Sequence, residues 1–148
     1  MNRHRHLKTA TLIGLLSVFS SMSQPEKQTF TIDLIVLFKE TGPLYIMVDN
    51  ESTSPKNDEG VRTLIHEFSD EELQSRRCSL SFPDMEAGVY GIKCYLDKNK
   101  NGKLDIGMFG PKEPWGMSIR DKRPIGPPKF EDYSFVLEGD SVITVSVK

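Results

Sequence analysis

Apolar and polar residues alternate with a period of two in a series of short segments separated by turn-forming residues. The segments "TFTIDLIVLF" (29–38), "LYIMVD" (44–49) and "VRTLIHEF" (61–68) have this character, and the first becomes continuously apolar towards its end. Successive side chains of a β-strand point to opposite faces of a sheet. The alternation therefore predicts strands that each bury one face.

Four further segments follow the same pattern, at 78–82, 89–96, 133–137 and 141–147. About seven short strands without a long helical pattern predict an all-β fold, an antiparallel β-sandwich of the Ig-like or transthyretin-like type. One helical turn is expected at "SDEEL" (69–73), because Ser69 and Glu72 have the spacing of a capping box.

The N-terminal residues have the composition of an export signal. Arg3, Arg5 and Lys8 precede an apolar run at 10–19, and the small residues Ser21 and Ser23 follow it. This order predicts a signal peptide at 1–23, with an apolar run too short to cross a bilayer. The chain is expected to be periplasmic or extracellular, with one domain at 24–148 and no transmembrane segment.

Charge is distributed unevenly along the predicted mature chain. Without the three basic residues of the signal, 16 Lys and Arg stand against 21 Asp and Glu, a net charge of −5, which argues against general nucleic-acid binding. The segment 97–129 carries eight basic and four acidic residues, a net charge of +4, and the remainder carries −9. One basic segment therefore lies on an acidic protein.

Two cysteines, Cys78 and Cys94, lie on neighbouring predicted strands joined by the turn-like "PDMEAG". If the strands form a hairpin in which Phe82 faces Tyr90, Cys78 faces Cys94. Directly opposed Cβ atoms lie roughly 4.5–5.5 Å apart, so a disulfide needs only a modest adjustment. An exported chain with two cysteines permits this bond, and two buried thiols are the alternative.

The segment 97–131 lacks a strand pattern, but its prolines and its aromatic residues Phe109, Trp115 and Phe130 predict one long ordered loop. Its first part, "DKNKNGKLD" (97–105), has the spacing of a calcium loop. Side-chain oxygens fall at positions 1, 3, 5 and 9, a glycine at 6 and a backbone carbonyl at 7; these residues are Asp97, Asn99, Asn101, Asp105, Gly102 and Lys103.

Position 12 of this loop, where calcium loops carry a bidentate acid, is Met108. With two carboxylates left, calcium affinity should be weak, roughly 10⁻⁴–10⁻³ M, and Glu113 or Asp121 could fold back as the missing ligand. The alternative is a metal-free turn in which Asp and Asn side chains bond their own backbone. We favour calcium.

The chain also resembles a family of exported bacterial proteins catalogued as a domain of unknown function. The resemblance rests on "DKNKNGKLD" (97–105), "FGPKE" (109–113) and "GPPKFED" (126–132), with "AGVYGIKCYLD" (87–97) before them. This chain departs from the family pattern at Leu96, where members have His, and at Ile119, where they have Asn. The resemblance implies a β-sandwich and export, with no established activity.

No catalytic constellation is apparent. His66 is the one histidine of the predicted mature chain and is interpreted as a surface or packing residue, and no zinc spacing, P-loop or dinucleotide fingerprint is present. We therefore expect a monomeric binding or structural module rather than an enzyme; a hydrolase using paired carboxylates is the less favoured alternative.

The loop offers candidate ligand-binding residues for a glycan or an anionic polymer. They are Phe109, Lys112, Trp115, Arg120, Lys122 and Arg123. For the aromatic side chains we favour the other interpretation, that they pack the loop onto the sandwich, because large side chains dominate burial.

Overall fold

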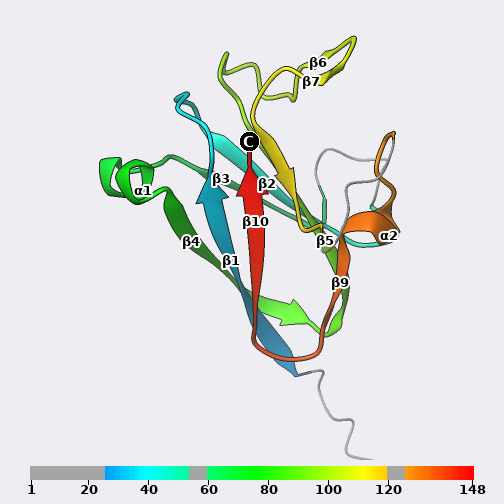
Figure 1. Cartoon of the computed structure of the whole chain (residues 1–148). Coiled ribbons are helices and arrows are strands. Elements are labelled where there is room, and N and C mark those ends of the chain that lie inside the picture. Colours follow the sequence, from blue (N-terminus) through cyan, green and yellow to red (C-terminus); the bar gives the residue numbers. More distant parts are fainter. Residues whose placement is uncertain (1–25, 54–59, 120–125) are drawn as a thin grey trace, which may run out of the picture.

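The computed structural model describes residues 26–53, 60–119 and 126–148. The predicted signal peptide at 1–23 lies outside these residues. The described elements are β1 (Lys27–Val36), β2 (Leu44–Asp49), β3 (Arg62–His66), α1 (Asp70–Ser75), β4 (Arg77–Glu86), β5 (Gly88–Leu96), β6 (Ile106–Gly107), β7 (Gly110–Pro111), β8 (Trp115–Met117), α2 (Phe130–Tyr133), β9 (Ser134–Leu137) and β10 (Ser141–Val147). Figure 1 shows their arrangement. Neither helix in these residues has the length and apolar character that crossing a membrane requires.

The described strands form two larger sheets and the two-stranded pair β6-β7, which confirms the all-β, sandwich-like fold. One sheet has the order β10-β1-β4, and the other has the order β3-β2-β5-β8 with β9 also paired to β5. The prediction of purely antiparallel pairing is wrong at one place, because β1 and β10 run parallel. Three short strands, β6 to β8, also lie in the segment that was expected to lack strands.

The core explains the alternation along the first strand. Phe30, Ile32, Leu34 and Val36 of β1 are buried, and the residues between them are partly exposed. The buried side chains of β1 pack in one cluster with those of β2, β4, β5, β9 and β10. Burial of this kind contributes roughly 25 cal/mol per Å² of apolar surface, so the sheets are held together mainly by their facing apolar side chains.

The predicted hairpin register between β4 and β5 is wrong. Only Ala87 separates the two strands, and they pair with different sheets. Cys78 lies opposite Leu34 on β1, whereas Cys94 lies opposite Ile46 on β2. The register that would have opposed the two sulfurs does not exist, and both cysteines are buried free thiols.

A buried polar network fixes α2 against the second sheet. Asp49 is fully buried, and its Oδ2 accepts a hydrogen bond from the Tyr133 hydroxyl at 2.8 Å and an ion pair from Lys93 Nζ at 2.9 Å. Gly91 allows the ring of Tyr133 to approach β5, since a Cβ there would lie 2.5 Å from it. The network therefore joins β2, β5 and α2 at the end of the sandwich where the long loop returns.

Candidate functional site

The candidate site begins where β5 leaves the sheet. The backbone N–H of Leu96 donates to the carbonyl of Pro114 at 2.8 Å, and that of Asp97 donates to Pro43 at 2.9 Å. Gly42 makes the second contact feasible, because a Cβ there would lie 2.5 Å from the carbonyl oxygen of Asp97. The first residue of the loop is thus fixed between two neighbouring segments of chain.

Asp97 organises the turn that follows it. Its side chain is buried, and Oδ1 accepts from the N–H of Asn101 at 3.0 Å while Oδ2 accepts from that of Gly102 at 2.7 Å. Gly102 has a positive φ of 76°, which a glycine adopts without strain. The hydroxyl of Tyr95 donates to the Gly102 carbonyl at 3.0 Å. One carboxylate therefore holds the far side of the turn onto the end of β5.

The two asparagines complete the turn. Asn99 Oδ1 accepts from the N–H of Asn101 at 3.1 Å, and Asn101 Oδ1 accepts from that of Lys103 at 2.8 Å. Their amide nitrogens both donate to the carboxylate of Asp105, at 2.7 Å from Asn99 and 3.3 Å from Asn101. These are Asx-turn contacts, so the structure forms the turn with hydrogen bonds of its own.

Glu113 is a second buried carboxylate, and it joins the two ends of the turn. Its side chain folds back onto the backbone of the turn. Oε1 accepts from the N–H of Lys98 at 2.8 Å, and Oε2 accepts from that of Asp105 at 3.1 Å. The N–H of Lys112 also donates to the Asp105 carbonyl at 2.8 Å. Hydrogen bonds to a charged group are stronger than neutral ones, so Glu113 closes the loop firmly.

The structure thus brings the predicted calcium ligands Asp97, Asn99, Asn101, Lys103 and Asp105 into one turn. Met108, at the twelfth position, is 92 % exposed and lies outside this turn. Glu113 uses both of its oxygens on backbone N–H groups, as Asp97 does. The turn gathers the oxygen ligands of a weak cation site with two carboxylates.

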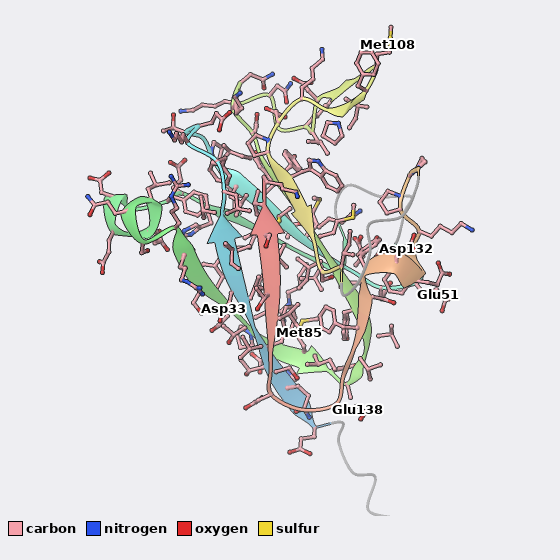
Figure 2. All side chains as sticks on the ribbon, in the orientation of Figure 1. Asp33, Glu51, Met85, Met108, Asp132 and Glu138 are labelled. Carbon is pink, nitrogen blue, oxygen red and sulfur yellow. The ribbon has the colours of Figure 1, made fainter. Side chains whose placement is uncertain are left out.

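Beyond the turn, β6 and β7 form a small hairpin that extends past the end of the sandwich (Figure 1). Phe109 is 100 % exposed, and Ile106 is exposed as well. Figure 2 shows Met108 at the outermost point of the molecule, at the end opposite Glu138. We call Ile106–Pro111 the tip. Its apolar side chains contact water although the loop that carries them is tightly bonded.

Of the six predicted ligand-binding residues, three are described, Phe109, Lys112 and Trp115, and the last two line one hollow. Phe109 and Lys112 are exposed on the loop, whereas Trp115 is partly buried in β8, where its backbone exchanges two 3.1 Å hydrogen bonds with Lys148. The prediction that aromatic side chains pack the loop onto the body thus holds for Trp115 and for the buried Phe130, and fails for Phe109. Arg120, Lys122 and Arg123 lie outside the described residues.

A groove of about 340 Å³ lies between the loop and the second sheet. Trp115, Tyr95, Met47, Met117, Lys93 and Lys103 are among its lining residues. The groove combines aromatic and apolar walls with the ammonium group of Lys103, while that of Lys93 is paired with Asp49. Such a lining suits a ligand that carries both ring faces and negative charge.

A cluster of His66, Glu72 and Cys78 was not foreseen from the sequence. His66 Nε2 lies 3.1 Å from Glu72 Oε2 and 3.3 Å from Cys78 Sγ. The three residues come from β3, α1 and β4, so only the tertiary fold brings them together. The three residues are spaced six positions apart, but this spacing does not predict that they meet. The one local feature that pointed to any of them was the capping box formed by Ser69 and Glu72.

The cluster is not a nucleophile–base pair in this state. Burial raises the pKa of the Cys78 thiol to about 12, with a further contribution from the nearby Glu72 carboxylate. Partial burial alone would raise the pKa of Glu72, but hydrogen bonds from Cys78 and Ser69 and the charge of His66 lower it to about 2. Sulfur and carboxylate also contact the same ring nitrogen, whereas a catalytic triad uses opposite nitrogens.

A comparison with protein families places residues 32–145 in a family described as "Uncharacterized protein conserved in bacteria (DUF2141)". Comparisons with curated proteins and with solved structures gave no match. The family description names no activity, so it adds no ligand to the geometry above.

Proposed function

The chain belongs to the DUF2141 family, and we propose that it is an exported, non-enzymatic binding module that contacts an anionic, lipid-bearing surface through the tip at Ile106–Pro111. Export is supported by the basic, apolar and small-residue order of residues 1–23. The observation that carries the binding role is the full exposure of Phe109 on a loop whose backbone is otherwise bonded to buried carboxylates.

Exposing the apolar side chains of the tip to water costs free energy unless a binding partner covers them. Burying a Phe or a Met side chain contributes about 1.5–3 kcal/mol each. Met108 and Phe109 are adjacent and almost completely exposed. A mobile loop could fold such residues inward, but the hydrogen bonds of Asp97 and Glu113 hold this one outward. A fixed apolar tip of this kind is typical of an interaction site.

The charges around the tip indicate the nature of the partner. Four lysines of the loop are exposed, namely Lys98, Lys100, Lys103 and Lys112, and one of them, Lys98, is paired with Glu40 at 3.6 Å. The carboxylates of Asp97 and Glu113 are buried and accept hydrogen bonds. The loop therefore presents ammonium groups and apolar side chains together, and an anionic bilayer offers headgroup charge with an apolar layer beneath it.

Vesicle co-sedimentation tests this proposal. The protein should bind vesicles rich in anionic lipid, should bind neutral vesicles poorly, and should lose affinity as salt screens the lysines. Phe109→Ser should weaken binding at least about tenfold, since 1.4 kcal/mol corresponds to a factor of ten. Val142→Ser is the matched control, because Val142 is an exposed apolar residue of β10 outside the loop.

The proposal fails if wild-type protein does not bind anionic vesicles, or if the control substitution weakens binding as much as Phe109→Ser does. Because Phe109 is fully exposed, its substitution should leave folding intact. A circular dichroism spectrum and a thermal melt of each variant establish that point.

The groove lined by Trp115 and Lys103 favours a second candidate function, the binding of an acidic polysaccharide. Trp115 is the single tryptophan of the chain, so its fluorescence reports directly on a polyuronate added to the protein. Saturable quenching that survives Phe109→Ser would support the groove. No change in fluorescence at millimolar sugar units would exclude it.

We also propose that the turn at 97–105 binds calcium weakly. Asp97, Asn99, Asn101, Asp105 and the carbonyl of Lys103 would hold the ion, which would stabilise the turn by neutralising its two carboxylates. The support is the set of Asx-turn bonds, which orient side-chain oxygens as calcium loops do.

Calcium binding is tested by thermal melts of chelator-treated protein. Roughly 10 mM calcium should raise the melting temperature of the wild type if the Kd is about 10⁻⁴–10⁻³ M, and Asp105→Asn should remove the shift. Equal shifts in wild type and Asp105→Asn, or no shift in either, would leave the metal-free turn as the correct interpretation.

A further inference from the structure

We propose that His66, Glu72 and Cys78 form a zinc site at the edge of the sandwich, separate from the loop. Among the residues that the structure describes, the ligand atoms of these three side chains converge within 4.8 Å of one another. Imidazole nitrogen, thiolate sulfur and carboxylate oxygen are the three ligand types that Zn²⁺ takes in proteins.

The observed separations are close to those of a zinc coordination sphere. Bond lengths of about 2.0 Å to nitrogen and oxygen and about 2.3 Å to sulfur, at tetrahedral angles, give ligand separations of about 3.3 Å for N···O and about 3.5 Å for N···S. The measured values are 3.1 Å between His66 and Glu72 and 3.3 Å between His66 and Cys78. The third separation, between Glu72 and Cys78, lies within the 4.8 Å that bounds the cluster, so side-chain adjustment would bring all three ligand atoms around the ion.

Regular structure positions all three ligands. His66 ends β3, Cys78 lies near the start of β4, and Glu72 is in the first turn of α1. The N–H of Ser69 donates to Glu72 Oε2 at 2.8 Å within the capping box, so the helix end orients the carboxylate. Phe68 packs edge-on against the ring of His66. Outer contacts of this kind orient metal ligands in known sites.

The chemistry of binding is simple. Zn²⁺ replaces the thiol proton of Cys78, which leaves as H⁺, and the ion bonds to Sγ, to neutral Nε2 of His66 and to Glu72 Oε2. Cys78 is buried, while the side chains of His66 and Glu72 are 19 % and 25 % exposed. A water molecule can therefore occupy the fourth position, and the ion can enter from the solvent side.

The position of the cluster gives the ion a structural role. β3 is an edge strand of one sheet and β4 is an edge strand of the other, and α1 connects them (Figure 1). A zinc bonded to all three elements would link the two sheets where the sandwich is open, at the side away from the contact between β8 and β10.

The test is zinc binding by the reduced, chelator-treated full chain. Calorimetry and elemental analysis should give one zinc per chain, and binding should release protons to the buffer. Co²⁺ used as a spectroscopic probe should give a thiolate-to-cobalt charge-transfer absorption.

Cys78→Ser and His66→Ala should each weaken zinc binding at least tenfold. Cys94→Ser is the matched control, since Cys94 is a buried thiol whose Sγ contacts the Gly116 carbonyl rather than this cluster. Ser69→Ala removes the helix cap and keeps all three ligands, so it separates loss of the ion from loss of the helix. The proposal is overturned if wild type binds no zinc, if the cobalt complex lacks the thiolate band, or if Cys94→Ser weakens binding as much as Cys78→Ser does.

Discussion

Replacing Glu113 by alanine should release the loop from the sandwich. The substitution removes both acceptors of the N–H groups of Lys98 and Asp105, at 2.8 and 3.1 Å. A hydrogen bond to a charged group contributes about 1.5–3 kcal/mol. Both N–H groups belong to residues that are at least partly exposed, so water can replace part of the loss. We therefore expect the lower end of the range, about 3 kcal/mol for the pair.

The assay combines chemical denaturation with limited proteolysis. Glu113→Ala should lower the free energy of unfolding by about 3 kcal/mol and should create a new cleavage site among the lysines at 98–112. Glu113→Gln keeps one acceptor and should lose about half as much.

Glu138→Ala is the control, because Glu138 is exposed in the turn before β10 and surface substitutions usually change stability by less than about 0.5 kcal/mol. The reasoning is refuted if Glu113→Ala costs no more than Glu138→Ala and leaves the protease pattern unchanged.

Three further predictions follow from buried or hydrogen-bonded groups. Tyr133→Phe removes the donor to the buried Asp49 and should destabilise the fold by about 1–3 kcal/mol in denaturation experiments; no loss would mean that Lys93 alone satisfies the carboxylate. Partial burial alone would raise the pKa of Glu72, but hydrogen bonds and the charge of His66 lower it from 4.5 to about 2. The ionised Glu72 carboxylate therefore stabilises the fold fully above pH 4.5, and this contribution disappears as the pH falls towards 2. Metal-free Glu72→Gln should therefore lose stability less steeply over that range, and parallel acid titration curves would contradict this. Burial raises the pKa of both Cys78 and Cys94 to about 12, so a thiol reagent should react with neither in the folded, reduced protein at pH 8 and with both after unfolding; rapid reaction of either would contradict it.

The alternation of apolar and polar residues predicted well which segments are strands, but it predicted poorly which strands pair with each other. The alternation along β1 marks its buried face because each inward side chain loses water contact whichever strand lies opposite. The turn-like residues before β5 and before β10 do not specify a hairpin, since a chain that crosses between facing sheets uses the same residues. The prediction that Cys78 faces Cys94 assumed that the two strands form a hairpin, and it is wrong because they do not.

In the candidate site, too, contacts between residues close in sequence were predictable and contacts between distant residues were not. The turn at Asp97 was predictable because its side-chain bonds join residues two to six positions apart. The sequence offered Glu113 only as one of two candidates for a missing calcium ligand, and its bonds to backbone N–H groups were not predicted, since it reaches 15 residues back along the chain. The exposure of Phe109 and the meeting of His66 with Cys78 depend on how separate elements pack, and no local pattern records that packing.

The central claim is that two buried carboxylates, Asp97 and Glu113, hold the loop in place without an ion. Amide hydrogen exchange in excess chelator tests it most directly, at the N–H groups of Lys98, Asn101, Gly102 and Asp105, which donate to these carboxylates. Exchange slowed on the order of a hundredfold relative to an unstructured peptide is expected. Exchange of these four amides at the unstructured rate, while the amides of β1 and β5 stay protected, would contradict the claim.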